Sequence, residues 1–172
     1  MSQQLQDAGI KIGSSTGYTR ELMQIVSKSA KEQGYIPECV LCAEDAPRGR
    51  PAPYLLFEAA KQLDVFPMWT IVKVDDTSVG IQAGRNAGCW SVGVTKSGNG
   101  VGLSEQQLQE LPEQEVRKKC VAAETQLLDA GAHYTVDSVA DLLPVLQLIN
   151  QRLIAGELPT DALRSGGPQG SF

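Results

Sequence analysis

Residues 70–77 read TIVKVDDT, an apolar, β-branched run that ends in the adjacent carboxylates of Asp75 and Asp76. A strand buried on both faces of a parallel sheet reads as such a continuous apolar run, and ligands of these sheets bind just beyond the carboxyl ends of the strands. Two neighbouring carboxylates repel each other, so they need water, a cation or a positive side chain. Oxygen ligands in a loop favour Mg²⁺. The alternative is that the pair opens the next helix as its N-cap.

The rest of the chain alternates between expected strands and expected helices. Apolar residues recur at helical spacing between Thr19 and Gln33, for example, and Gly34 ends that segment. This order predicts an α/β fold, a Rossmann-like parallel sheet with helices on both faces. The expected strands are residues 10–13, 39–42, 70–74, 90–94 and 133–136, and the expected helices are residues 19–33, 53–63, 80–87, 104–128 with a break at Pro112, and 138–153.

The length and composition fit one globular domain. The chain has 172 residues, of which 42% are hydrophobic and 20% are charged, and a domain of this size buries a real core. We expect that domain at residues 1–155. Residues 156–172, in which Gly166, Gly167 and Pro168 stand together, are expected to form a disordered tail.

The net charge of −5 argues against a nucleic acid or an anionic membrane as partner. No apolar run is long enough to span a bilayer. The first eight residues are rich in glutamine and lack the apolar core of a signal peptide. These features predict a cytoplasmic protein.

The cysteines and the single histidine are expected to be structural. Cys39, Cys42, Cys89 and Cys120 suit a reduced compartment. Residues 39–42 have the C-x-x-C form, but no second such motif or histidine cluster accompanies them, which favours buried thiols over zinc or redox chemistry. His133 stands far downstream of the other candidate site residues.

Polar groups follow the first three expected strands. Residues 14–17, SSTG, offer hydroxyls and backbone amides suited to a phosphate. Arg48 and Arg50 in the next loop offer guanidinium groups that can bind two phosphate oxygens. With Asp75 and Asp76 they form a set that could handle a phosphoryl group. Taken singly, they also fit an ordinary turn and two solvated arginines.

Several segments resemble the phosphonoacetaldehyde hydrolases, or phosphonatases, of the haloacid dehalogenase superfamily. The resemblance covers about residues 8–150. The TGYT and GRP pieces are fairly specific to that family, whereas the Asp-Asp loop is shared by the whole superfamily. The matching pieces are residues 11–21 (KIGSSTGYTRE), 49–51 (GRP), 71–77 (IVKVDDT), 84–94 (GRNAGCWSVGV) and 131–135 (GAHYT).

The resemblance implies a mechanism and a role for matching residues. In that family a lysine forms a Schiff base with the aldehyde, a carboxylate attacks the phosphorus, and Mg²⁺ is required; the products are acetaldehyde and phosphate. By this resemblance Thr16 hydrogen-bonds the transferring group, and Gly17 helps to bind the phosphate. Arg50 supplies a cation at the phosphate, and Asp76 is a metal ligand.

The chain departs from the family pattern in two respects. The family nucleophile lies in an Asp-x-x-Gly-Thr motif after the first, central strand, and the lysine lies in a helical cap inserted next; neither is found in these 172 residues. We therefore expect an incomplete core with two open sheet edges. Gly80 stands where many family members have a second loop aspartate, and Asp75 is expected to replace it at the metal.

Two functions fit this pattern. The first is the core portion of a Mg²⁺-dependent phosphonatase, inactive as this chain alone. The alternative is a non-catalytic pseudo-hydrolase that binds phosphate or metal, or an interaction module. The expected partners are a small phosphonate or phosphate, and either a second copy, through the side where the cap is missing, or another chain.

Overall fold

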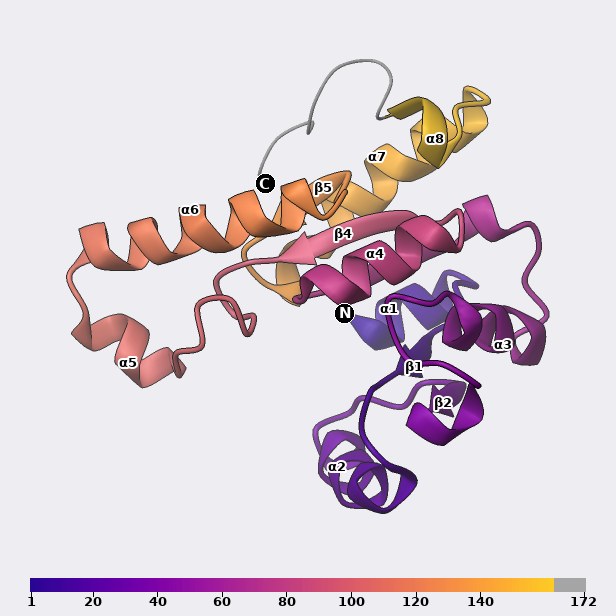
Figure 1. The fold of residues 1–172 in the computed structure, drawn as a ribbon, viewed down its shortest axis with the longest axis horizontal. Helices are drawn as coiled ribbons and strands as arrows, with labels where there is room; N and C mark the ends of the chain where they lie inside the picture. The colour runs from indigo at the N-terminus through magenta and orange to yellow at the C-terminus, as the bar shows by residue number, and fades with distance from the viewer. Residues whose placement is uncertain (163–172) are drawn as a thin grey trace.

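Two parallel sheets lie side by side in the computed structural model, which describes residues 1–162 (Figure 1). Strands β1 (Gly13–Ser15) and β2 (Cys39–Leu41) form one sheet. Strands β3 (Val72–Asp75), β4 (Trp90–Val94) and β5 (Tyr134–Val136) form the other, in that order. Every strand pairing is parallel, so the carboxyl ends of paired strands share one edge.

Helices follow or connect the strands, as an α/β fold requires. None of the helices described in residues 1–162 is long and apolar enough to cross a membrane. The α-helices are α1 (Ser2–Asp7), α2 (Arg20–Glu32), α3 (Tyr54–Gln62), α4 (Ser78–Asn86), α5 (Glu105–Glu110), α6 (Glu113–Asp129), α7 (Leu142–Ile154) and α8 (Pro159–Ala162), and the 3₁₀ turns are η1 (Ala43–Asp45), η2 (Met68–Thr70) and η3 (Val139–Asp141).

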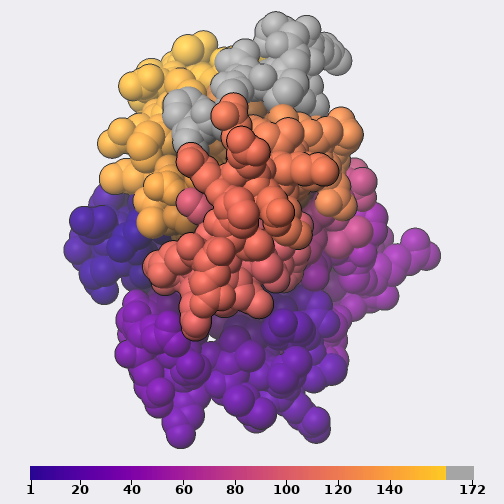
Figure 2. Space-filling model, turned by 90° about the vertical axis from the view of Figure 1, so that its left-hand side faces the viewer, coloured from indigo at the N-terminus to yellow at the C-terminus, as the bar shows by residue number. Residues whose placement is uncertain are grey.

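The main core lies between the three-stranded sheet and α7. Alternate residues of β4, among them Trp90 and Val92, pack with Val145 and Ile149 of α7. The other face of the sheet is covered by α4 and α6, where Ile81, Leu127 and Ala132 form a second cluster. In Figure 2, α5 and the start of α6 project toward the viewer, between the purple β1–β2 part below and α7 above.

The predicted strands are present, and two of them begin two or three residues later than expected. The strand expected at residues 90–94 is β4 itself. The first strand starts at Gly13 and includes Ser14 and Ser15, which were expected in a turn, because its position is set by pairing with residues 39–41 of β2. The third strand starts at Val72, after η2, and extends to Asp75.

Two prolines stand at the starts of helices, and the one at residue 112 makes the break that the sequence predicts. Helices α5 and α6 are separated at Pro112. Pro144 is the third residue of α7, so it lies in the first turn, where its missing N–H breaks no helical hydrogen bond. Within the tail predicted at residues 156–172 the structure describes α8. Residues 163–172 lie outside the described part, so the tail stays a prediction there.

The two sheets leave open strand edges between them. Within residues 1–162, β1 pairs with β2 alone and β3 pairs with β4 alone, so each of these two strands has one unpaired edge. The side chain of Lys73 on β3 reaches across, and its Nζ donates to Oγ of Ser15 on β1 over 3.3 Å. This division agrees with the expectation that a central strand is missing between them.

Helix α2 carries the predicted apolar stripe but buries no residue. Leu22 and Ile25 are 44% and 71% exposed. Its start is well defined, since the Thr19 hydroxyl accepts a hydrogen bond from the Leu22 N–H. The helical period therefore predicted the element correctly, although nothing in the described part of the chain covers its apolar face.

Candidate active site

The loop from β3 to α4 is held by its own side chains. Oδ1 of Asp75 accepts hydrogen bonds from N–H and Oγ1 of Thr77, at 2.9 and 2.7 Å. Thr77 is the N-cap of α4, and its Oγ1 accepts from the Gly80 N–H at 3.1 Å. The N-cap is thus Thr77 and not the two aspartates. Asp75 stabilises the cap through Thr77, and its second oxygen remains for other contacts.

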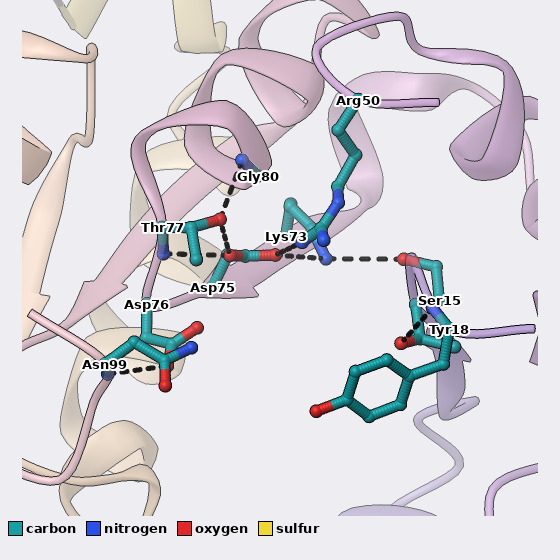
Figure 3. Close-up of polar contacts among 10 residues, drawn as sticks. Ser15, Tyr18, Arg50, Lys73, Asp75, Asp76, Thr77, Gly80 and Asn99 are labelled. Carbon is teal, nitrogen blue, oxygen red and sulfur yellow. Dashed lines mark hydrogen bonds and ion pairs between the residues drawn. The ribbon is translucent and has the colours of Figure 1, made fainter. Parts of the chain in front are cut away.

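That second oxygen binds two cations. Oδ2 of Asp75 lies 2.9 Å from Nζ of Lys73 and 3.4 Å from Nη1 of Arg50 (Figure 3). The Asp75 and Lys73 side chains are only 7% and 9% exposed. Burial raises the pKa of the Asp75 carboxyl, but the Lys73 ammonium and the Thr77 hydrogen bonds outweigh it, so the pKa is lowered. Asp75 is therefore ionised at neutral pH.

Asp76 points away from Asp75, toward the loop that contains Asn99 (Figure 3). Its Oδ2 accepts a hydrogen bond from the Asn99 N–H at 2.8 Å. Among the described residues, no lysine or arginine forms an ion pair with Asp76. Of the two adjacent aspartates, Asp76 thus has the carboxylate that no cationic side chain neutralises.

The hydroxyl-rich turn meets Arg50 at the end of β1. The Tyr18 N–H donates to Oγ1 of Thr16 at 3.1 Å (Figure 3). A Cβ atom added to Gly17 would lie 3.1 Å from Nη2 of Arg50, so the guanidinium lies directly against this glycine. On its other side the loop is fixed to α4, because Asn86 donates to the Pro51 carbonyl at 2.9 Å.

The structure thus gathers most of the residues singled out in the sequence. Arg50 lies between Gly17 and Asp75. In the sequence Thr16 directly precedes Gly17, and Asp76 directly follows Asp75. The rim they form spans two sheets and not one continuous sheet. Arg48, in the same loop as Arg50, is exposed.

Sequence reasoning missed Lys73, which lies at the centre of this cluster. It stands between two valines of β3, and only 8% of it is exposed. A buried lysine requires a partner, and that rule could have linked it to the adjacent Asp75. Its contact with Ser15 depends on how the two sheets lie together, which no local pattern encodes.

The donor set can be compared with what Mg²⁺ requires. Residues 1–162 contain no cluster of three or more His, Cys, Asp and Glu able to hold a metal. Mg²⁺, however, keeps several waters and takes one or two carboxylates plus phosphate oxygens. Asp76 fits this requirement. Both oxygens of Asp75 are engaged, by Thr77 and by the cations, and its role as a second ligand stays a prediction.

A family model for haloacid dehalogenase-like hydrolases matches residues 1–88. The chain belongs to this family. The fold agrees: the crystal structure of a phosphonoacetaldehyde hydrolase-like protein from Oleispira antarctica superimposes with a TM-score of 0.89 and 44% sequence identity, covering 91% of this chain and 57% of that one.

Curated relatives of this haloacid dehalogenase-like chain carry the phosphonatase name. A phosphonoacetaldehyde hydrolase of Syntrophobacter fumaroxidans is 42% identical over 151 residues, 88% of this chain and 54% of the relative. One of Paraburkholderia phytofirmans is 44% identical over 155 residues, 90% of this chain and 58% of the relative. The chain therefore resembles phosphonoacetaldehyde hydrolases, and it spans a little over half of their length.

The cysteines and the histidine of this haloacid dehalogenase-like core are partly or fully buried. The four cysteines are free thiols, and burial raises the pKa of each. His133 precedes β5, at the end of the sheet opposite the rim, and is 2% exposed. Its Nδ1 accepts from the Ser91 N–H at 2.9 Å, and its Nε2 lies 2.9 Å from the Pro159 carbonyl oxygen and 2.7 Å from Nη1 of Arg85.

This environment predicts a pH dependence of stability. Burial, together with the nearby Arg85, lowers the pKa of His133 to about 4. In the unfolded chain His133 binds a proton as the pH falls through about 6.5, whereas in the folded chain it binds one only near pH 4. The contribution of His133 to the free energy of unfolding is therefore fully present above about pH 6.5 and is lost as the pH drops toward 4. We expect the free energy of unfolding to fall by about 1.5 kcal/mol from pH 6.5 to pH 5, measured by urea denaturation. The same slope in His133→Gln would contradict this assignment.

Proposed function

We propose that this chain is the phosphate- and metal-binding part of a phosphonoacetaldehyde hydrolase, which splits a C–P bond to give acetaldehyde and phosphate with Mg²⁺. One observation supports the proposal above others. Three pieces that resemble this family, SSTG, GRP and DDT, meet at one place, where Arg50 lies against Gly17 and pairs with Asp75. Relatives of that name at 42% and 44% identity support the substrate class.

Each side chain has a role that follows from its contacts. Thr16 Oγ1 already accepts a hydrogen bond from the Tyr18 N–H, which leaves its own proton to donate to a phosphoryl oxygen. Arg50 directs Nη1 at Asp75 and Nη2 along Gly17, so the guanidinium faces the turn that would hold the phosphate. Asp76 would hold Mg²⁺, which supplies positive charge to the transferring group.

The nucleophile and the Schiff-base lysine would come from outside these residues. By the family resemblance, the nucleophile lies on a strand between those that correspond to β1 and β3, and in this structure Lys73 of β3 donates to Ser15 of β1 over 3.3 Å between the two sheets. A parallel strand placed there would bring its carboxyl end to Thr16, Arg50 and Asp76.

The second candidate is a binding protein without catalysis. It is favoured by the two cations on Asp75, because a carboxylate paired with both Lys73 and Arg50 is not available as a nucleophile. A protein of this kind would bind inorganic phosphate with Mg²⁺ and release nothing. The two candidates share the binding site and differ in acetaldehyde production once a nucleophile is supplied.

The 172-residue chain alone should bind phosphate and form no acetaldehyde. A covalent catalyst that is absent is not replaced by binding groups. Calorimetry with inorganic phosphate and Mg²⁺ should show binding that Arg50→Gln weakens about tenfold, because a charge-assisted hydrogen bond contributes about 1.5 kcal/mol. Arg48→Gln is the matched control and should bind as the native chain does. Acetaldehyde above a heat-killed control, or equal affinity in both variants, would contradict the proposal.

A further inference from the structure

Gly80 and Asp75 compete for the same space. A Cβ atom added to Gly80 would lie 2.0 Å from Cγ of Asp75 and 2.1 Å from each of its carboxylate oxygens. Gly80 is buried in the first turn of α4, and its backbone has an ordinary helical conformation. The glycine is therefore required by space and not by backbone angles: the Asp75 carboxylate fills the volume of a residue-80 side chain.

From that place the carboxylate connects both halves of the rim. Its Oδ2 pairs with Lys73 of β3 and with Arg50 of the preceding loop. Lys73 in turn donates to Ser15 of β1, on the other sheet (Figure 3). Two cations and one carboxylate leave a net positive charge beside the hydroxyl-rich turn, and the carboxylate fixes where both cations lie.

We propose that Asp75 is a positioning residue, which holds Lys73 and Arg50 toward residues 15–17, and that Gly80 is the partner that makes room for it. The two residues form one unit: a side chain at residue 80 displaces the carboxylate and releases both cations. The inference stands apart from the proposed function, because it concerns contacts within this chain and its test uses neither phosphonate nor catalysis.

The shared space is tested by a thermal-stability cycle. Gly80→Ala in the native chain should lower Tm by about 5 °C or more, the shift that one or two kcal/mol produces in a domain of this size. In the Asp75→Gly background the space is free, so the same Gly80→Ala change should leave Tm unchanged or raise it, because alanine favours a helix over glycine. An equal loss in both backgrounds would overturn the shared-space claim.

The positioning role is tested by the NMR signal of the Lys73 ammonium, assigned with Lys73→Gln. A lysine NH₃⁺ signal is observed when close contacts, above all an ion pair, slow the exchange of its protons with water. The signal should be present in the native chain, absent in Asp75→Gly/Gly80→Asn, and restored in Asp75→Gly/Gly80→Asp, where the carboxylate returns from the other side of the loop. Persistence without a carboxylate, or no return with it, would overturn the proposal.

Two further measurements keep the test decisive. Asp75→Asn preserves the shape of the side chain and removes only its charge, so the Lys73 signal should be lost even if the double variants do not fold. Titration of the native chain with Mg²⁺ should leave the signal in place, since Asp75 remains paired with Lys73. Loss of the signal on adding Mg²⁺ would show that Asp75 leaves the cations to bind metal, which would contradict the positioning role.

Discussion

Asp76→Asn should lower the turnover of phosphonoacetaldehyde about a hundredfold or more in a restored protein. This restored protein is a fusion of two pieces. The segment of the Paraburkholderia phytofirmans relative that the match does not cover is joined to the start of the present chain. A metal beside the transferring group contributes several kcal/mol of charge stabilisation in the transition state, and Asp76 is the aspartate of the pair without a cationic partner. The assay is acetaldehyde release at increasing Mg²⁺, in which the variant should also need more Mg²⁺.

Two other aspartate variants serve as controls for Asp76→Asn. Asp129→Asn changes an exposed aspartate at the end of α6 and should leave turnover unchanged. Asp75→Asn should cost much less than Asp76→Asn. Comparable losses at both positions would mean that the pair shares the metal, and a loss confined to Asp75→Asn would assign the metal to the wrong member of the pair.

Trp90→Ala should cost about 4 kcal/mol of unfolding free energy, the range for removing a large aromatic side chain from a core. Trp90 is fully buried in the main core of the sheet. The Arg152 guanidinium lies 5.0 Å from its ring centroid, so a cation–π contact is lost as well. Its Nε1 has no hydrogen-bond partner among the described groups, so the loss is one of packing and not of hydrogen bonding.

The second tryptophan provides the matched control. Trp69 lies in η2 and is 44% exposed, so Trp69→Ala should cost no more than about 1 kcal/mol. Urea denaturation followed by circular dichroism measures both variants against the native chain. Similar losses in the two variants would mean that the core does not centre on β4 and α7 as the structure has it.

The sequence predicted the elements whose signals are local. The apolar run at residues 90–94 became β4, and the break at Pro112 separates α5 from α6. Boundaries set by a distant partner were less accurate: β1 lies about three residues downstream of its apolar segment, because pairing with β2 decides which residues form the ladder. The stripe on α2 predicted a helix correctly, although periodicity does not say what covers it.

The candidate site was predicted through its positions and not through its contacts. The placement of Thr16, Arg50 and Asp76 after successive strands indicated one rim, and Arg50 does meet Gly17 and Asp75 there. The pairing of Lys73 with Asp75 was not predicted, nor was the close approach of Asp75 to Gly80. Both depend on side-chain directions at the end of β3, which the order of residues leaves open.

Acetaldehyde release from phosphonoacetaldehyde by the restored protein decides whether this chain is part of a phosphonatase. We propose that residues of this chain form the phosphoryl-binding and metal-binding part of a phosphonatase, with the nucleophile supplied on a strand between β1 and β3. We expect Mg²⁺-dependent acetaldehyde formation that neither part produces alone. A restored protein that folds and binds phosphate, yet releases no acetaldehyde at any Mg²⁺ concentration, would contradict it and leave the chain a phosphate-binding protein without this activity.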